Sequence, residues 1–265
     1  GAITPARAEI AIDVEGVDAE LRRNVLAFLS LERYKGRDDL DEALMERLQE
    51  RAVRETRNAL RPFGYYDPKV ETEITRSGNR SWRARIRIEP GTPVVMQEVT
   101  VQVLGPGADN PSLNAIATKL PLRPGDRLNH AAYETIKGDL TRTAATLGYL
   151  DAKLTRNELV VDPPNHVASA ALVLETGFRY RFGATTIEQS VINETLLRRF
   201  LRYQQDDPFD ATQLLRTQFA LDDSRGRGSM MPFAYPLNGP GATARTLLFS
   251  PIPRRTATFA STSKG

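Results

Sequence analysis

The segment GYYDPKV at residues 64–70 returns as GYLDAKL at residues 148–154, and this repetition decides the fold of the chain. The two copies are 84 residues apart. A second pair of similar segments, EPGTPV at residues 89–94 and ETGFRY at residues 175–180, has its glycines 86 residues apart. A period this long holds several secondary-structure elements, so the sequence predicts a tandem array of small domains.

The first copy is predicted to begin with a strand and two helices. Apolar and polar side chains alternate over residues 9–16, as in a half-buried strand. Asp18 then caps a helix that breaks near Lys35. A longer helix is expected to start with Asp39 as its N-cap and with Glu42, three residues on, as the capping-box partner.

Gly64 ends this longer helix, because glycine adopts the left-handed conformation that a side chain makes costly. Two strands, residues 69–76 and 81–89, follow and are joined by a short Ser-Gly-Asn turn. The repeating unit therefore has the order β-α-α-β-β. The predicted fold class is α+β, with tandem units that each form a three-stranded sheet with two helices on one face.

The second and third copies are predicted from the same periodicities. The second copy contains a strand at 99–103, a weak helix at 112–118, a helix with apolar residues from Tyr133 to Leu147, and strands near Ala152 and Val167. The third copy contains a strand at 180–187, a helix with Ile192, Leu196, Phe200 and Leu201, and a helix after Asp210.

The repeat pattern stops after Ser224, where a glycine, an aromatic residue and two strands are expected. Residues 225–265 instead contain five prolines and no acidic residue. The predicted domains are two complete units at 8–91 and 92–177, and a third unit at 178–224 that lacks its closing hairpin. Residues 225–265 are interpreted as a basic Pro- and Gly-rich tail that is non-native or disordered.

The excess positive charge of the chain lies in this tail. The whole chain has 36 basic and 33 acidic residues, whereas residues 225–265 alone have six basic and no acidic ones. Residues 1–224 therefore carry a net charge of −3. A high isoelectric point is thus no argument for a nucleic-acid-binding surface on the repeats.

Several function classes are excluded by what the sequence lacks. There is no cysteine, no recognisable signal peptide and no apolar run of the roughly 18 residues that a membrane helix requires. No nucleophile elbow, phosphate-binding loop, dinucleotide fingerprint or zincin motif occurs. The two histidines, His130 and His166, lie 36 residues apart without companions at metal-binding spacing. We therefore expect no enzyme activity, no cofactor and no metal.

Units of β-α-α-β-β order with a Gly-aromatic step before the second strand resemble POTRA domains, the polypeptide-transport-associated modules of outer-membrane assembly barrels. The similarity is greatest to the outer-membrane subunits of translocation and assembly modules. It rests on the segments ALRPFGYYDPKV from Ala59, ATLGYLDAKL from Ala144 and ETGFRYRFGATTIEQS from Glu175. It covers about residues 9–224, and the membrane barrel of that family is absent from this sequence.

The resemblance implies a scaffold at the periplasmic face of the bacterial outer membrane, and a periplasmic location for this chain alone. The implied partners are unfolded outer-membrane-protein or autotransporter clients and an inner-membrane-anchored partner subunit of the module. Nucleic acid is not an expected partner. Membrane association would be through the absent C-terminal barrel.

An exposed sheet edge is the candidate binding site. An extended client can add to an edge strand through main-chain hydrogen bonds. In the resembled family the second strand of a unit is the usual edge, which corresponds here to residues 69–76 and 152–159. The residues expected to contact clients are Lys69, Val70, Thr72 and Ile74 in the first unit and Lys153 and Thr155 in the second.

Three arginines form a second candidate surface. Arg83, Arg85 and Arg87 alternate with apolar residues, so their guanidinium groups are predicted to share one face of a strand. A solvated sheet face explains this pattern without any function. The functional interpretation is contact with an acidic partner or a lipid headgroup, since arginine binds carboxylate and phosphate through two hydrogen bonds.

Two other identities stay open from the sequence. One is the POTRA region of a different assembly barrel or of a two-partner secretion barrel. The other is a KH-like nucleic-acid-binding module, which shares a β-α-α-β order. KH domains need a GXXG loop between their helices, and the helix joints here contain none.

Overall fold

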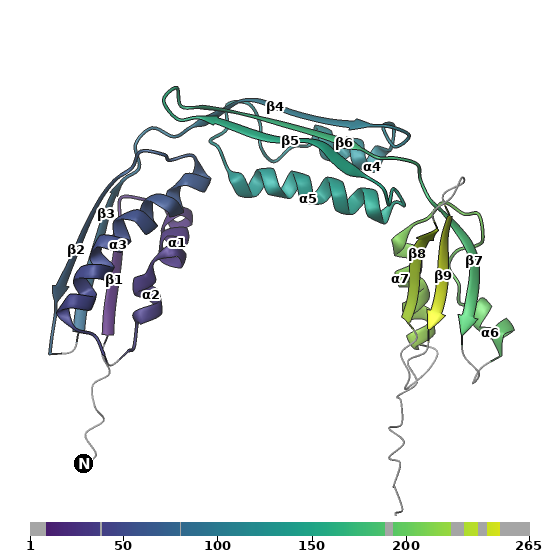
Figure 1. Ribbon diagram of the computed structural model, residues 1–265, viewed down its shortest axis with the longest axis horizontal. Coiled ribbons are helices and arrows are strands. Elements are labelled where there is room, and N and C mark those ends of the chain that lie inside the picture. The colour runs from purple at the N-terminus through teal and green to yellow at the C-terminus, as the bar shows by residue number, and fades with distance from the viewer. Residues whose placement is uncertain are drawn as a thin grey trace, which may run out of the picture. The chain divides into compact units, whose positions relative to one another are not determined.

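The computed structural model describes residues 9–37, 39–79, 81–188, 193–223, 231–237 and 243–249. It contains three three-stranded sheets with helices beside them, which confirms the predicted α+β class (Figure 1). The chain divides into two compact units, one of Gly1–Val101, Thr118–Gly138 and Arg156–Leu172 and one of Gln102–Ala117, Asp139–Thr155 and Val173–Gly265. The domain boundaries drawn from the sequence repeat stay a prediction.

The first sheet is formed within the first repeat. Its elements are β1 (Glu9–Glu15), α1 (Ala19–Phe28), α2 (Ser30–Tyr34), α3 (Glu42–Leu60), the 3-10 turn η1 (Arg61–Phe63), β2 (Lys69–Arg76) and β3 (Ser81–Glu89). The strand order is β1-β3-β2, with β1 parallel and β2 antiparallel to the central strand β3. The helices lie on one face of this sheet (Figure 1).

The caps of these helices differ in part from the prediction. Asp18 caps α1 as expected, and its Oδ1 accepts a hydrogen bond from the Leu21 N–H at 2.9 Å. The N-cap of α3 is Asp41, which accepts from the Leu44 N–H at 2.7 Å, so the prediction of Asp39 was wrong. Asp39 instead pairs with Arg37, because the two side chains meet across the turn.

Alternating apolar residues of β1 and β3 form the core with one stripe of each helix. Each strand turns every second side chain toward the helices, and each helix turns every third or fourth residue toward the sheet. The buried core includes Ile10, Val14, Leu21, Val25, Leu48, Ala52, Trp82, Ala84, Ile86 and Ile88. The other face of the sheet is open to solvent.

The second sheet follows the same order as the first. Its elements are β4 (Val95–Leu104), α4 (Pro111–Thr118), α5 (His130–Thr146), β5 (Lys153–Asp162) and β6 (Val167–Glu175). The strand order is β4-β6-β5, which places β6 in the centre. The predicted elements of this repeat are confirmed.

The third sheet corrects the prediction that the third unit lacks its closing hairpin. Its elements are β7 (Arg181–Glu188), α6 (Glu194–Arg198), α7 (Ala211–Asp223), β8 (Met231–Leu237) and β9 (Thr243–Phe249), and the strand order is β7-β9-β8. Strand β8 was not predicted because it contains Pro232 and Pro236, although an edge strand tolerates proline. Residues 250–265 of the predicted tail and Ile192 lie outside the described residues.

Candidate functional site

The edge strand β2 of the first sheet is the candidate binding site. Because β3 is central, one side of β2 pairs with β3 and the other side has no strand beside it among the described residues. An unpaired edge of this kind offers backbone N–H and C=O groups to a further strand.

Two hydrogen bonds show which residues of β2 turn their backbone outward. The Ser77 N–H donates to the Ser81 carbonyl at 2.8 Å, so the odd-numbered positions exchange backbone bonds with β3. The Ile74 N–H donates instead to the Oε1 of Gln49, on helix α3, at 3.1 Å. The even-numbered positions, which include Val70 and Thr72, therefore direct their backbone groups away from β3.

This alternation sorts the predicted client-contacting residues of the first sheet. Val70, Thr72 and Ile74 have outward backbone groups, as augmentation requires, although the N–H of Ile74 is already bonded. Lys69 pairs its backbone with Glu89 of β3, and its ammonium lies 3.3 Å from the Glu89 carboxylate. Lys69 can thus contact a client only through its side chain.

In the second sheet, β5 is likewise an edge strand. Lys153 and Thr155 are both exposed, and the Thr155 hydroxyl donates to the Val173 carbonyl at 3.4 Å. The 84-residue offset makes them equivalent to Lys69 and Glu71, whose backbone groups pair inward. If β5 follows β2, its outward backbone groups belong to the residues between them, such as Leu154.

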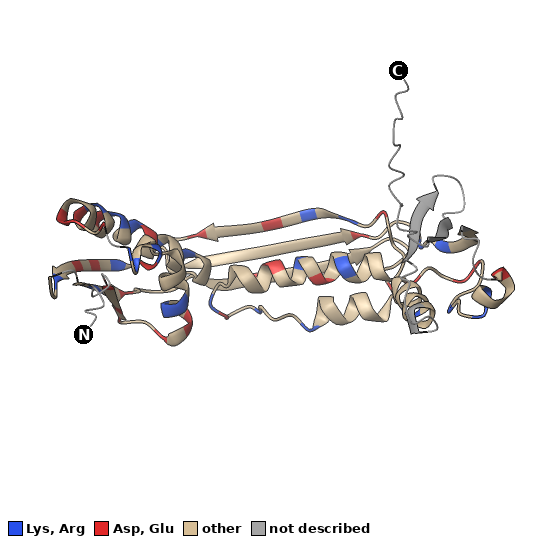
Figure 2. Ribbon diagram, turned by 90° about the horizontal axis from the view of Figure 1, so that it is seen from below, with Lys and Arg blue, Asp and Glu red and all other residues tan. Residues whose placement is uncertain are grey.

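The three arginines lie on the solvent face of the central strand β3. The register places carboxylates on both sides of two of them, with Arg85 between Asp13 and Glu73, and Arg87 between Glu15 and Glu71. Figure 2 shows acidic and basic residues interspersed along these strands. Arg83 lies between Ala11 and Thr75 and has no carboxylate directly opposite. The face is therefore mixed in charge, and Arg83 is the one of these three arginines that has no carboxylate directly opposite on either neighbouring strand.

The ion pairs on this face are long. The Nε atoms of Arg85 and Arg87 lie 3.6 and 3.5 Å from the two carboxylate oxygens of Glu15. The Nε of Arg85 is shielded from solvent and has no hydrogen-bond partner among the described residues. Sequence reasoning treated the arginines alone and missed the flanking carboxylates. The signal was present, because acidic residues alternate in both neighbouring strands.

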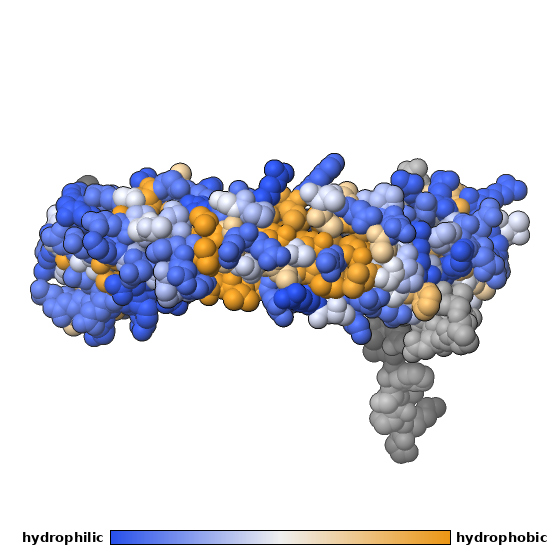
Figure 3. All heavy atoms as spheres, turned by 90° about the horizontal axis from the view of Figure 1, so that it is seen from above, coloured by the Kyte–Doolittle hydropathy of each residue, from blue (hydrophilic) through white to orange (hydrophobic). Residues whose placement is uncertain are grey.

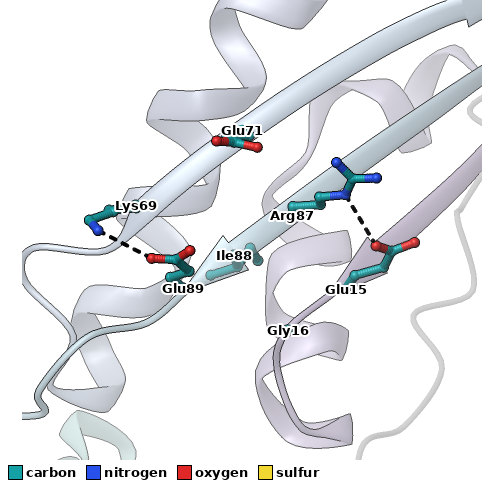
Figure 4. A pocket seen from close by; sticks show the side chains of 7 residues that line it. All are labelled: Glu15, Gly16, Lys69, Glu71, Arg87, Ile88 and Glu89. Carbon is teal, nitrogen blue, oxygen red and sulfur yellow. Dashed lines mark ion pairs between the residues drawn. The ribbon is translucent and has the colours of Figure 1, made fainter.

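A pocket of about 270 Å³ lies where β1 and β3 end and the edge strand β2 begins. It is lined by Glu15, Gly16, Lys69, Glu71, Arg87, Ile88 and Glu89, and Figure 4 shows the Arg87–Glu15 and Lys69–Glu89 pairs on its walls. Gly16 has φ of +87°, and a Cβ there would come within 2.0 Å of the Ile88 carbonyl. The walls of the pocket therefore carry charges of both signs.

Apolar side chains distinguish the second sheet from the first. Figure 3 shows them gathered in the middle of the view, where β4 and β6 lie in Figure 1. Val95 of β4 and Val160 of β5 are 36% and 62% exposed. The second sheet thus exposes apolar groups, whereas the open face of the first sheet is mixed in charge.

His130 lies in the first turn of α5. Its Nε2 is 3.5 Å from the Tyr66 hydroxyl, and burial lowers the pKa of its imidazole against the opposing effect of Glu134. The described residues include no group of three or more His, Asp or Glu side chains that could hold a metal ion. None of the described helices is both long and apolar enough to cross a membrane.

Residues 11–90 match the family model of the POTRA domain described as TamA domain 1. Among solved structures, the chain is similar to POTRA3-5 of Haemophilus influenzae BamA, with 14% identity, 94% of this chain and 98% of that chain covered, and a TM-score of 0.47. It is also similar to POTRA1-3 of the periplasmic domain of Omp85 from Anabaena, with 15% identity, 92% and 94% covered, and a TM-score of 0.34.

A third similar structure is CdiB from Acinetobacter baumannii, with 12% identity, 89% of this chain and 39% of that chain covered, and a TM-score of 0.33. The identity and the TM-score are low for all three structures. The matched segment spans β1 from its third residue, all the helices of the first repeat, and both strands of its hairpin. The first repeat, residues 11–90, is therefore POTRA-like in both its sequence and its topology.

Proposed function

We propose that this chain is a non-enzymatic interaction scaffold of an outer-membrane-protein assembly or translocation factor of the TamA type. It works in the periplasm and binds extended client polypeptides by adding them as strands to the edges of its sheets. Its clients are unfolded outer-membrane proteins or autotransporters. Its second partner is the inner-membrane-anchored subunit of the same module.

The observation that carries this proposal is the outward direction of the Val70 and Thr72 backbone groups on the edge strand β2. Main-chain pairing at an edge is largely independent of the client's side chains, which suits a scaffold for many clients. The pocket at the end of the sheet adds polar groups of both signs beside the same edge. The match of residues 11–90 to a POTRA domain supports the cellular setting.

Amide hydrogen exchange tests the proposal. The protein is measured alone and with an unfolded peptide of about ten residues that has the alternating apolar and polar pattern of a transmembrane β-strand. We expect the peptide to slow exchange at Val70 and Thr72, with a matching effect on β5. A peptide of the same composition in scrambled order, without the alternation, is the control. Unchanged exchange along both β2 and β5 would contradict direct client binding.

A further inference from the structure

Gln49 ties helix α3 to the candidate edge at two neighbouring positions. Its side-chain Oε1 accepts a hydrogen bond from the Ile74 N–H at 3.1 Å, and its backbone carbonyl accepts from the Thr72 hydroxyl at 3.3 Å. Gln49 is half-buried, beside the core residue Leu48. The helix thus reaches around to the side of β2 where none of the described strands lies.

This contact uses a group that an added strand would need. In an antiparallel or parallel ladder, the outward N–H of every second residue donates to the incoming strand. On β2 these donors include Val70, Thr72 and Ile74, and the third is occupied by the Gln49 amide. An incoming strand can pair with Ile74 only after the Gln49 side chain has left.

We infer that Gln49 closes the Ile74 position of the edge and separates the Val70 and Thr72 positions from Arg76 at the end of β2, so that a client can form an unbroken ladder only over Val70 and Thr72. The inference rests on the proposed function of β2 as a strand-binding edge. Gln49 is therefore a specificity-determining residue, because it sets how many positions of β2 can pair with a client and does not change the hydrogen bonds at the other positions. It also restrains unwanted pairing between edges, a hazard that exposed strands carry.

The second repeat offers an internal comparison. Tyr133 follows Gln49 by 84 residues, the same offset that relates Gly64 to Gly148. Its hydroxyl donates to the side-chain oxygen of Asn157 at 2.8 Å and so does not occupy a backbone N–H of β5. The helix position that closes part of the first edge therefore serves a side-chain contact in the second.

Substitutions at Gln49 test the inference. Gln49→Met keeps the length of the side chain but has no acceptor for the Ile74 N–H, whereas Gln49→Glu keeps an acceptor. We expect the Ile74 amide of Gln49→Met to exchange faster in the free protein. We also expect the alternating peptide to bind about threefold to tenfold more tightly, because one more ladder position becomes available. Gln49→Glu should keep the Ile74 amide as slow to exchange as in the unchanged protein, and Tyr133→Phe should bind the peptide as the unchanged protein does.

The outcomes separate the two proposals. Tighter binding accompanied by peptide-dependent slowing at Ile74 supports the inference, since structural damage alone would weaken binding. Equal affinity of Gln49→Met and the unchanged protein, with slowing at Val70 and Thr72 in both, overturns the role of Gln49 and leaves the edge function intact. Faster Ile74 exchange in Gln49→Met without peptide effects on any β2 or β5 amide overturns the proposed function.

Discussion

The carbonyl oxygen of Gly64 accepts a hydrogen bond of 2.8 Å from the backbone N–H of Val94. The glycine that ends the helical segment of the first repeat therefore also anchors the chain just before β4. The same bond recurs one period later, where the Tyr180 N–H donates to the Gly148 carbonyl at 2.8 Å. The repeated Gly-Tyr step thus ends a helix and also connects its repeat to the start of the next one. We call the Gly64–Val94 contact the first joint and the Gly148–Tyr180 contact the second joint.

The substitution Gly148→Ala should lower the free energy of unfolding by more than the cost of the left-handed backbone alone. Gly148 has φ of +92°, and a Cβ there would lie 2.7 Å from the Phe209 carbonyl and 2.9 Å from the Phe209 Cβ. Left-handed backbone costs a non-glycine residue about 1–2 kcal/mol, and the close approach adds to this cost. Urea unfolding measures the loss in the free energy of unfolding.

Gly125 supplies the control for this substitution. Its φ is +89°, but a Cβ there would meet no atom within 4 Å. Gly125→Ala should therefore show the backbone cost without the contact cost. Equal losses in the Gly125 and Gly148 variants would contradict the close packing of the second joint.

Arg127 is expected to stabilise the first joint through its contacts with aromatic rings. Its guanidinium lies 5.7 Å from the centre of the Phe63 ring and 5.5 Å from that of Tyr65, and 3.3 Å from the Glu20 carboxylate. Arg127→Met keeps an apolar stem but removes the cation, and should lower the free energy of unfolding by about 0.5–1 kcal/mol. Urea unfolding at low salt measures this change.

Arg142 is the matched control for Arg127. It pairs with Asp139 three residues earlier on α5, and its side chain is 71% exposed. Arg142→Met should change the free energy of unfolding by less than about 0.5 kcal/mol. A loss in Arg142→Met as large as that in Arg127→Met would argue against the aromatic contribution.

Arg83 is the residue with which to test the acidic-partner interpretation of the charged face. Arg85→Glu would place a third carboxylate beside Asp13 and Glu73, and like charges opposite one another destabilise a sheet. Arg83→Glu avoids this clash, because its neighbours are Ala11 and Thr75. We expect Arg83→Glu to weaken binding of the inner-membrane-anchored partner at unchanged unfolding midpoint. Calorimetry showing the same affinity would reject a role for this face.

The order of the elements could be predicted from the sequence because the apolar periodicity and the glycine positions indicated the same elements. Alternation identified β1 and β3, and the glycines marked the helix ends. The cap at Asp41 was misplaced because Asp39 and Asp41 both suit an N-cap, and only the pairing of Asp39 with Arg37 separates them. The hairpin of the third sheet was missed because its prolines oppose a strand unless the strand order makes β8 an edge.

The candidate site was predicted less completely than the fold. The edge location of β2 followed from the resemblance, but the alternation of its inward and outward backbone groups depends on the register with β3. The carboxylates beside Arg85 and Arg87 come from strands that are distant in sequence. Gln49 contacts Ile74 across 25 residues, and no local pattern indicates this bond.

His130 should make the stability of the protein depend on pH. Burial lowers the pKa of its imidazole, and its position in the first turn of α5 also disfavours the charged form. A lowered pKa in the folded state means that the stabilisation is present above the ordinary histidine pKa and is lost as the pH falls through the folded-state value. The urea midpoint should therefore fall between pH 7.5 and 5.5, and fall less in His130→Gln.

The exposed His166 supplies the comparison for this measurement. The unfolding midpoint of His166→Gln is measured over the same pH range. If the two variants show the same pH dependence, the neutral imidazole of His130 beside Tyr66 does not contribute to folding.

Proline at Thr72 is expected to block the edge without breaking the sheet. The Thr72 N–H points away from β3, so its removal costs no bond within the first sheet, and edge strands accept proline when this side faces solvent. Thr72→Pro should reduce the affinity for the alternating peptide about threefold to tenfold, because one ladder bond is lost and the ring projects toward the incoming strand. Thr72→Val keeps the N–H while losing the hydroxyl that contacts Gln49, and should bind the peptide as before.

The substitution Glu73→Pro is the control for the direction of the backbone. Because the backbone of Glu73 pairs with Arg85, this proline removes a bond within the first sheet and should lower the urea midpoint. Thr72→Pro and Glu73→Pro with the same urea midpoint would show that the alternation derived for β2 is reversed or absent.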